Sequence, residues 1–269
     1  MVSSNALIAI LPALLTTLAA ARSSDTHPAP VLLAGGIHAL LAIFVFDLSN
    51  QITGVPEDRI NKPSRPLVTG LLSMRGAWWR LAAAISLLLL TGYLLGIIHL
   101  ALLWVAVAGA NNHLGLARRP FCKPLVVGVQ AASQLLSAWE IGGGRSDRFL
   151  PCAIAVSALL AVLMPLQDLR DIEGDRNVGR RTLPIAYGSW PVRIYMCVAL
   201  VLTPAIVRGL VEWNILWSGG WLEVLAAGIC ACAAVRVVAL RNAANDDRTY
   251  RLLVLWYATI ATCPLIATL

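Results

Sequence analysis

Two polar stretches of this 269-residue chain carry acidic residues at spacings that suit metal and phosphate chemistry. The second stretch contains Asp168, Asp171 and Asp175. Residues three or four apart share one face of a helix, so these carboxylates can act together on one hard cation. Mg²⁺ binds through one or two carboxylates and leaves coordination positions for phosphate oxygens. The spacing therefore predicts a site for Mg²⁺ and a phosphate-rich ligand.

The first stretch has a similar layout over residues 47–66 and includes Asn50, Gln51, Glu57 and Asp58. Asn50 and Asp58 are eight residues apart, so they share a helical face if the helix is continuous between them. Both stretches begin at the end of an apolar run. Ionisable residues at membrane depth are costly and usually line a functional cavity. Two such clusters favour a functional site over ordinary solvated loop charges.

Basic residues flank both stretches and suit the anionic partner that such a site requires. We expect Arg65, Arg118 and Lys123 to contact a diphosphate, because guanidinium and ammonium groups pair with phosphate oxygens. The sequence Asn-Asn-His at 111–113 lies just before Arg118 and predicts a third loop segment over the site. Within it, Asn112 is the expected ligand contact.

The elements that position these residues are apolar helices. The chain is 58% hydrophobic and 13% charged, about half the charge of a soluble domain. A membrane span needs roughly 20 apolar residues and must be helical there. Nine segments meet this description, at about 4–21, 29–50, 77–95, 97–110, 124–141, 149–167, 190–207, 217–240 and 252–268. The expected fold is an all-α membrane bundle of about nine helices around a central cavity, forming one unit over residues 1–269.

The distribution of charge gives an orientation and excludes other classes of protein. Most of the 21 Lys and Arg residues lie beside the second, fourth, sixth and eighth predicted connections, so these even-numbered loops are expected in the cytoplasm. The net charge of +7 therefore reflects membrane orientation, and no nucleic-acid partner is expected. The charged residues gather at one membrane edge, whereas a transporter binds near the midplane. The six cysteines show no pairing or metal-ligand spacing.

The fifth apolar segment carries a polar stripe that must face the interior of the bundle. Gln130, Ser133, Gln134 and Ser137 recur there at helical spacing. Two interpretations stay open: hydrogen bonding between helices, or lining of a substrate chamber by Gln130 and Gln134. The aromatic candidates for the wall of that chamber are Trp104, Trp139, Trp256 and Tyr257.

These motifs resemble those of the UbiA superfamily of intramembrane prenyltransferases. The family pattern is N-D-x-x-D-x-x-x-D followed by R-P, with a later D-x-x-x-D. Asn50, Asp58 and residues 65–66 match the first motif, and Asp171 and Asp175 match the second. The resemblance covers the whole chain and implies a nine-span membrane enzyme that uses Mg²⁺ to ionise an isoprenyl diphosphate. It also implies catalytic roles for the four matched Asn and Asp residues.

One departure from the family pattern narrows the prediction. Gln51 and Gly54 stand where prenyltransferases carry Asp, and Glu57 stands beside Asp58. This variant resembles the UbiA-type terpene cyclases, which close the prenyl chain on itself. The expected metal ligands are Asn50, Glu57, Asp58, Asp168, Asp171 and Asp175. The expected diphosphate contacts are Gln51, Arg65, Asn112, Arg118 and Lys123.

A second function stays open at this point: transfer of the prenyl group to an aromatic or other lipophilic acceptor. Both reactions share the ionisation step and differ in what traps the cation. The sequence leaves the length of the prenyl chain, the product skeleton, the residue that completes the first metal site and the oligomeric state undetermined.

Overall fold

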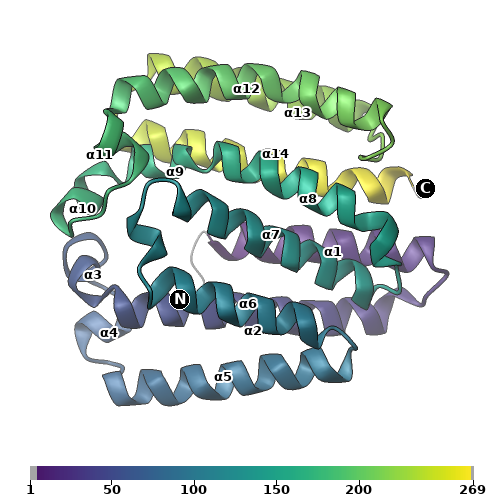
Figure 1. Ribbon diagram of the computed structural model, residues 1–269, viewed down its shortest axis with the longest axis horizontal. Helices are drawn as coiled ribbons and strands as arrows, with labels where there is room; N and C mark the ends of the chain where they lie inside the picture. The colour runs from purple at the N-terminus through teal and green to yellow at the C-terminus, as the bar shows by residue number, and fades with distance from the viewer. Residues whose placement is uncertain (1–4, 268–269) are drawn as a thin grey trace.

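A computed structural model describes residues 5–267, and the regular structure in this part of the chain consists of helices alone, without strands (Figure 1). Its long helices are α1 (Asn5–Ser23), α2 (Pro28–Thr53), α5 (Met74–Leu94), α6 (Ile98–Asn112), α7 (Cys122–Ile141), α8 (Ser146–Leu163), α12 (Ser189–Glu212), α13 (Trp221–Ala239) and α14 (Ala243–Ala267). The short ones are α3 (Val55–Asn61), α4 (Pro66–Thr69), the 3₁₀ turn η1 (Leu116–Arg118), α9 (Pro165–Arg170), α10 (Ile172–Asn177) and α11 (Leu183–Tyr187).

The outer surface of the bundle is apolar, as a lipid-facing surface must be. Large side chains such as Leu33, Tyr93, Val201 and Val224 are exposed. Within residues 5–267, six stretches are long and apolar enough to cross a membrane: α2, α5, α8 with α9, α12, α13 and α14. Helices α1 and α6 have shorter apolar stretches. The predicted integral membrane, all-helical fold is confirmed, while the number of nine spans stays a prediction.

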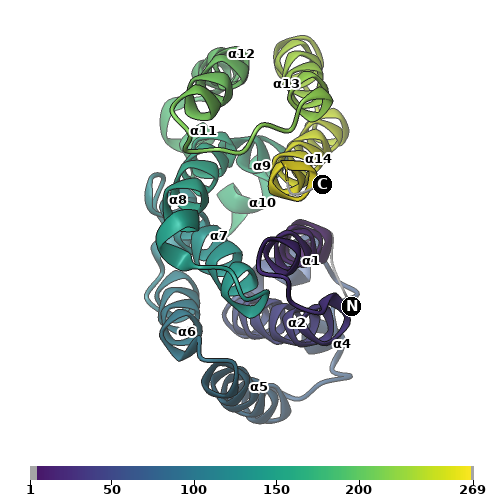
Figure 2. The ribbon, with the colours of Figure 1, turned by 90° about the vertical axis from the view of Figure 1, so that its right-hand side faces the viewer.

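The long helices lie side by side along the longest axis of the molecule (Figure 1). Seen from one end, α5 lies at one edge and α12 with α13 at the other (Figure 2). Helix α7 lies between them and packs against α1, α6 and α8. Because it is surrounded by other helices, its polar side chains Gln130, Ser133, Gln134 and Ser137 are buried in protein. This placement explains how a span with such a polar stripe is accommodated.

The short helices gather at one end of the bundle, where both acidic stretches lie (Figure 1). Proline and glycine set their boundaries. Helix α9 begins at Pro165, directly after α8, because proline supplies no N–H to continue the preceding helix. Helix α2 ends before Gly54, and α3 starts at Val55. The long helices therefore deliver the acidic residues to short, reoriented turns at the bundle end.

The last helix departs from the predicted segment. It begins at Ala243, nine residues before the apolar run that starts at position 252. Its first turns carry Asp246, whose carboxylate accepts hydrogen bonds from Arg193 of α12 at 2.7 and 2.6 Å. A prediction from hydropathy starts this segment only where the apolar run begins. The polar residues before it are nevertheless helical, and Asp246 among them is paired with Arg193.

Candidate active site

One cavity of about 490 Å³ joins the polar end of the bundle to its apolar interior. Its lining comes from helices near the start and near the end of the chain. The charged lining residues are Glu57, Lys62, Arg65, Lys123, Arg170, Asp171, Arg180 and Asp247. The interior lining includes Ile43, Phe46, Trp104, Val127, Leu160 and Tyr257. A ligand with a charged head and an apolar tail matches this division.

A second pocket of about 290 Å³ adjoins the charged end. The two share Asn50, Glu57, Asn111 and Arg180 among their lining residues. The smaller pocket adds Asn112 and Arg118, from the connection between α6 and α7. The predicted third loop segment therefore contributes to both pockets, through Asn111 to the main cavity and through Asn112 to the smaller one.

In the first acidic stretch, Glu57 and Asp58 are each paired with an arginine. Asp58 is buried and accepts a hydrogen bond from Arg65 at 2.5 Å. Glu57 pairs with Arg180 at 2.6 Å. Between α2 and α3, Gly54 allows the chain to turn: a Cβ at this position would lie 2.8 Å from the carbonyl oxygen of Asn50. Asn50 and Asp58 thus lie on two successive helices, and the continuous helix considered from the sequence is not formed.

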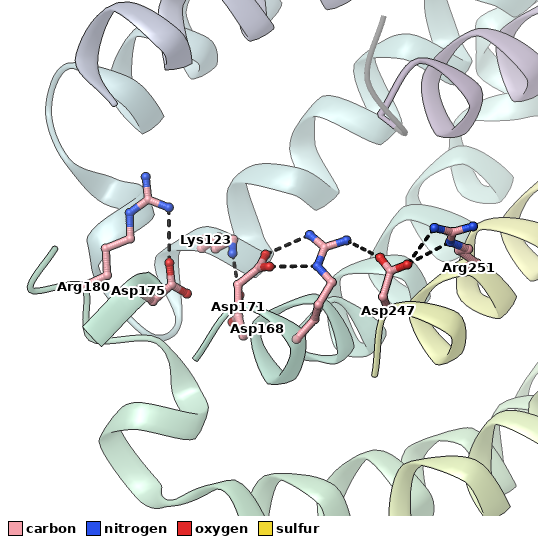
Figure 3. A network of polar contacts seen from close by, with 8 residues as sticks. Lys123, Asp168, Asp171, Asp175, Arg180, Asp247 and Arg251 are labelled. Carbon is pink, nitrogen blue, oxygen red and sulfur yellow. Dashed lines mark hydrogen bonds and ion pairs between the residues drawn. The ribbon is translucent and has the colours of Figure 1, made fainter. Parts of the chain in front are cut away.

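Asp168, Asp171 and Asp175 of the second stretch are also paired with basic side chains. Asp168 is buried and forms an ion pair with Lys123 of α7. Arg170 donates to both oxygens of Asp171 at 2.8 Å and to Asp247 of α14 at 3.0 Å. Figure 3 shows these side chains in a row with their neighbours: Arg180, Asp175, Lys123, Asp168, Asp171, Asp247 and Arg251. The row extends across segments that are far apart in the sequence.

Arg180 connects the two acidic stretches. It contacts Glu57 at 2.6 Å and Asp175 at 3.4 Å through different nitrogens of its guanidinium group. Helices α3 and α10 also pack against each other. The motifs from the first and second halves of the chain therefore meet at one place, and a basic side chain lies between their acids.

The electrostatics of Asp171 and Asp175 differ. Burial disfavours the charge on Asp171, but hydrogen bonds from Arg170 and the charges of Arg170 and Lys123 hold its pKa below the usual value. Burial raises the pKa of Asp175, and the nearby Lys123 and Arg180 offset this only in part. One oxygen of Asp175, Oδ2, is buried without a hydrogen-bond partner. A cation beside Asp175 would stabilise its charged form and satisfy that oxygen.

The donor set fits Mg²⁺, which prefers carboxylate and amide oxygens. Within residues 5–267, no three His, Cys, Asp or Glu side chains converge as a ready-made metal cluster. A Mg²⁺ site does not require such a cluster, because Mg²⁺ needs only one or two protein carboxylates when a ligand supplies phosphate oxygens. The neighbouring Arg and Lys side chains balance the acidic charge in the arrangement observed.

A model of the UbiA prenyltransferase family matches residues 9–260 of the chain. The chain belongs to this family. Among its relatives, it is 34% identical over 269 residues to somaliensene A/B synthase of Streptomyces somaliensis, covering 97% of this chain and 88% of that protein. It is 37% identical over 154 residues to the diterpene cyclase eriG of Hericium erinaceus, covering 56% of this chain and 50% of eriG.

Solved structures show the same fold. A UbiA homolog from Aeropyrum pernix K1 matches with a TM-score of 0.74 and 20% identity over 100% of both chains. A UbiA homolog from Archaeoglobus fulgidus, bound to GPP and Mg²⁺, matches with a TM-score of 0.60 and 14% identity over 96% of both chains. The chain is therefore an integral membrane enzyme of the UbiA fold, of the terpene synthase or prenyltransferase kind.

The predicted site residues of this UbiA-family chain fall into three groups. Those that line the cavity are Asn50, Glu57, Arg65, Lys123, Gln130, Gln134 and Asp171. Asp58, Asp168 and Asp175 are buried and paired with basic side chains of the charged end. Asn112 and Arg118 line the adjoining pocket. The two motifs and their predicted cations are thus brought together.

Two predicted residues lie elsewhere. Trp139 does not line this cavity in the described structure: its ring stacks on Phe149 with centroids 4.3 Å apart, and its N–H donates to the carbonyl of Arg145. The cavity wall is formed instead by Trp104 of α6 and Tyr257 of α14. Gln51 is buried beside Asn50, but it is not among the residues described as lining either pocket.

Four charged residues of the site were not predicted from the sequence: Lys62, Arg170, Arg180 and Asp247. Arg170 and Arg180 flank the second motif, so their position within that stretch was an available signal. The signal for Asp247 was weaker. It belongs to an acidic pair at the start of the last helix, and its contact with Arg170 joins residues 77 positions apart.

Proposed function

We propose that this UbiA-family enzyme is a Mg²⁺-dependent membrane terpene cyclase. It ionises a linear isoprenyl diphosphate, farnesyl or geranylgeranyl, releases diphosphate and cyclises the carbocation. The observation that carries this proposal is the cavity of about 490 Å³, which has charged groups of both signs at one end and an apolar, aromatic interior. The relatives named as a synthase and a diterpene cyclase support the cyclase reading over transfer.

The charged end is the proposed diphosphate site. Arg65, Lys123 and Arg180 line it and supply positive charge to phosphate oxygens. Asn112 and Arg118 in the adjoining pocket are proposed to contact the same group as it enters. Gln51 lies outside this lining, so its proposed contribution is indirect, through its neighbour Asn50.

The residues proposed to hold Mg²⁺ are Asn50, Glu57, Asp58, Asp168, Asp171 and Asp175. Asp175 is the strongest of these on structural grounds, because its buried Oδ2 has no partner. Mg²⁺ in such a site supplies electrostatic stabilisation of the departing diphosphate. The Mg²⁺ found with GPP in the Archaeoglobus fulgidus homolog supports the assignment.

The chain's own residues account for the remaining steps. Basic side chains at the charged end stabilise negative charge as the allylic C–O bond breaks. The buried position of the cavity keeps bulk water from the cation. The rings of Trp104 and Tyr257 present π faces to positive charge in the interior. Folding of the prenyl chain against this wall then brings a double bond to the cation.

The alternative is transfer of the prenyl group to an aromatic or other lipophilic acceptor, the activity for which the family is named. The two functions are separated by incubating the purified protein in detergent with geranyl, farnesyl or geranylgeranyl diphosphate and Mg²⁺, without an acceptor. Cyclic products that disappear with EDTA and return with added Mg²⁺ support the cyclase. Diphosphates that stay intact until an aromatic acceptor is added reject it in favour of the transferase.

We also propose that the charged end faces the cytoplasm, because the basic residues of the chain concentrate in the same loops. A reporter that is active only outside the cytoplasm, fused at the C-terminus, should be active. If the C-terminal reporter is inactive and the same reporter fused between α5 and α6 is active, the odd number of spans is contradicted. The orientation proposed for the charged end is then still supported.

A further inference from the structure

A third and much smaller cavity adjoins the interior of the 490 Å³ cavity and lies between α1, α2, α6 and α7. Its volume is about 10 Å³, and its polar lining residues are His38, Ser133, Gln134 and Ser137. A volume of roughly 10–15 Å³ holds one water molecule. Trp104 and Gln134 line both this cavity and the main one. The small cavity is therefore a neighbour of the space proposed for the carbocation.

This cavity lies far from the charged end. His38 precedes Asn50 by twelve residues of α2, roughly 18 Å at 1.5 Å per residue. Gln134 follows Lys123 by eleven residues of α7, roughly 16 Å on the same basis. The two helices thus give about the same distance between this cavity and the charged end. A cation formed near this end of the prenyl chain is beyond the reach of the diphosphate.

The hydrogen bonds of His38 define its tautomer. The hydroxyl of Thr91 donates its one hydrogen to the carbonyl of Leu88 at 2.9 Å. The same hydroxyl lies 3.3 Å from Nδ1 of His38, so it accepts a hydrogen bond from Nδ1–H. In the neutral imidazole, which is the form that can act as a base, Nε2 then carries the lone pair. Among the described residues, no acidic side chain pairs with His38 to favour its protonated form beforehand.

Gln134 supplies a second polar group that lacks a hydrogen-bond partner. Its Nε2 is buried and has no hydrogen-bond partner. A bound water would supply the hydrogen bond that this buried amide lacks. Ser133 and Ser137 already donate to the carbonyls of Leu100 and Ser133. A water in this cavity would therefore accept from Gln134, and its own hydrogen would be available to the lone pair of His38.

Trp104 lies where the two cavities adjoin, because it lines both. Its indole N–H donates to the carbonyl of Ala42 at 2.8 Å, which fixes the ring between α6 and α2. A fixed π face stabilises a neighbouring cation. In the described part of the chain, His38 is the only histidine that lines either cavity.

We propose that His38, acting through one water held by Gln134, is the base that ends the carbocation cascade. The inference rests on the proposed cyclase function. A C–H bond next to the cationic carbon breaks, and its electron pair forms the new C=C bond. The proton passes to the water, and a proton of that water passes to Nε2 of His38. The product is a cyclic hydrocarbon, and the imidazolium loses its proton to solvent after product release.

The test compares His38→Gln with wild type. Glutamine keeps a hydrogen-bonding group near Thr91 but is a far weaker base. Diphosphate release and hydrocarbon products are measured in the same reactions, with Mg²⁺. The expected result is a fall of at least about tenfold in the main hydrocarbon per diphosphate released, with other products in its place. Thr91→Val, which removes the acceptor for Nδ1–H, should shift the products in the same direction but less.

His99→Gln is the matched control, because His99 is exposed and lies outside both cavities in the described structure. An unchanged product pattern in His38→Gln overturns the proposal. So does an equal loss of diphosphate release and product, which indicates a structural role. A wild-type reaction in H₂¹⁸O whose main product is an ¹⁸O-labelled alcohol also overturns it, since water then adds to the cation. Failure of the cyclase function itself is recognised separately, by the absence of acceptor-free diphosphate release in wild type.

Discussion

Two groups of buried ion pairs occur in this UbiA-family enzyme, one between α12 and α14 and one at the charged end of the cavity. In the first, Arg193 donates to both oxygens of Asp246 at 2.7 and 2.6 Å and to the carbonyl of Val237 at 2.9 Å. Both side chains are buried. Every oxygen of that carboxylate has a partner, and neither residue lines the cavity in the described structure.

The charged end has the same residue types in a different arrangement. Arg180 is shared between two acids of separate motifs, and Asp175 keeps one buried oxygen unpartnered. Most of these side chains line open space. A closed pair holds helices together, whereas a shared and incomplete set can exchange its partners for a ligand. The number of filled hydrogen-bonding positions, rather than burial, distinguishes the site from the structural pair.

The largest effect on stability is expected for Asp246→Ala. The change leaves Arg193 buried without its counter-charge, which costs about 3–5 kcal/mol of unfolding free energy. It should lower the midpoint of denaturation in detergent while the folded fraction retains enzymatic activity. Asp147→Ala is the control, because the Arg145–Asp147 pair is exposed and its loss should leave the midpoint unchanged. Equal stability of the two variants would contradict the role given to Asp246.

Asp171→Asn is expected to lower activity and to leave stability nearly unchanged, the reverse of Asp246→Ala. This near-isosteric change removes a carboxylate from the cavity and should lower kcat/KM about 10²- to 10³-fold through lost stabilisation of the ionising transition state. The denaturation midpoint should move little. Glu173→Gln removes an exposed acid from the same stretch and should keep wild-type activity. Similar losses in both variants would show that only the overall charge of the loop matters.

A smaller effect is expected for Arg180→Gln. Its guanidinium contacts both Glu57 and Asp175, so its loss removes positive charge from the diphosphate site and the link between α3 and α10. Activity should fall about 10- to 100-fold, mostly through weaker binding of the diphosphate. The measurement is KM for the prenyl diphosphate. Arg176→Gln, an exposed neighbour in α10, should have wild-type KM; if Arg180→Gln does too, Arg180 is not a diphosphate ligand.

The smallest effect is expected for Gly54→Ala. Its Cβ would lie 2.8 Å from the carbonyl oxygen of Asn50, so the turn between α2 and α3 must shift. A local strain of about 1 kcal/mol or more predicts a loss of activity of about three- to tenfold. Gly228→Ala in α13, where a Cβ meets no heavy atom within 4 Å, is the control and should be fully active. Full activity of Gly54→Ala would mean that the geometry of this turn is not needed.

Much of the fold follows from the sequence, because lipid requires long apolar helices and tolerates few exceptions. The polar stripe of α7 also indicated its place inside the bundle, and Gln130 and Gln134 line the cavity as one of the two interpretations expected. The spacing of the acidic motifs placed their carboxylates near each other. These features depend on local patterns, which a sequence displays directly.

The partners of the acidic residues depend on packing between distant segments. Arg170 reaches Asp247 across 77 positions, and Lys123 reaches Asp168 across 45. The rotation of each helix is also set by its neighbours. Trp104 and Trp139 both lie in apolar helices, yet only Trp104 faces the cavity in the described structure. No local pattern distinguishes these two side chains.

The polarity of α7 has a consequence for how the protein is made. Within residues 5–267, this 20-residue helix is not among those apolar enough to cross a membrane by composition. Its buried amide and hydroxyl groups would lower its partitioning from the translocon into lipid as a single segment. Helix α7 is therefore expected to enter the bilayer together with α6 or α8, which pack against it. The residues that shape the reaction chamber thus make membrane insertion of the middle of the chain a cooperative event.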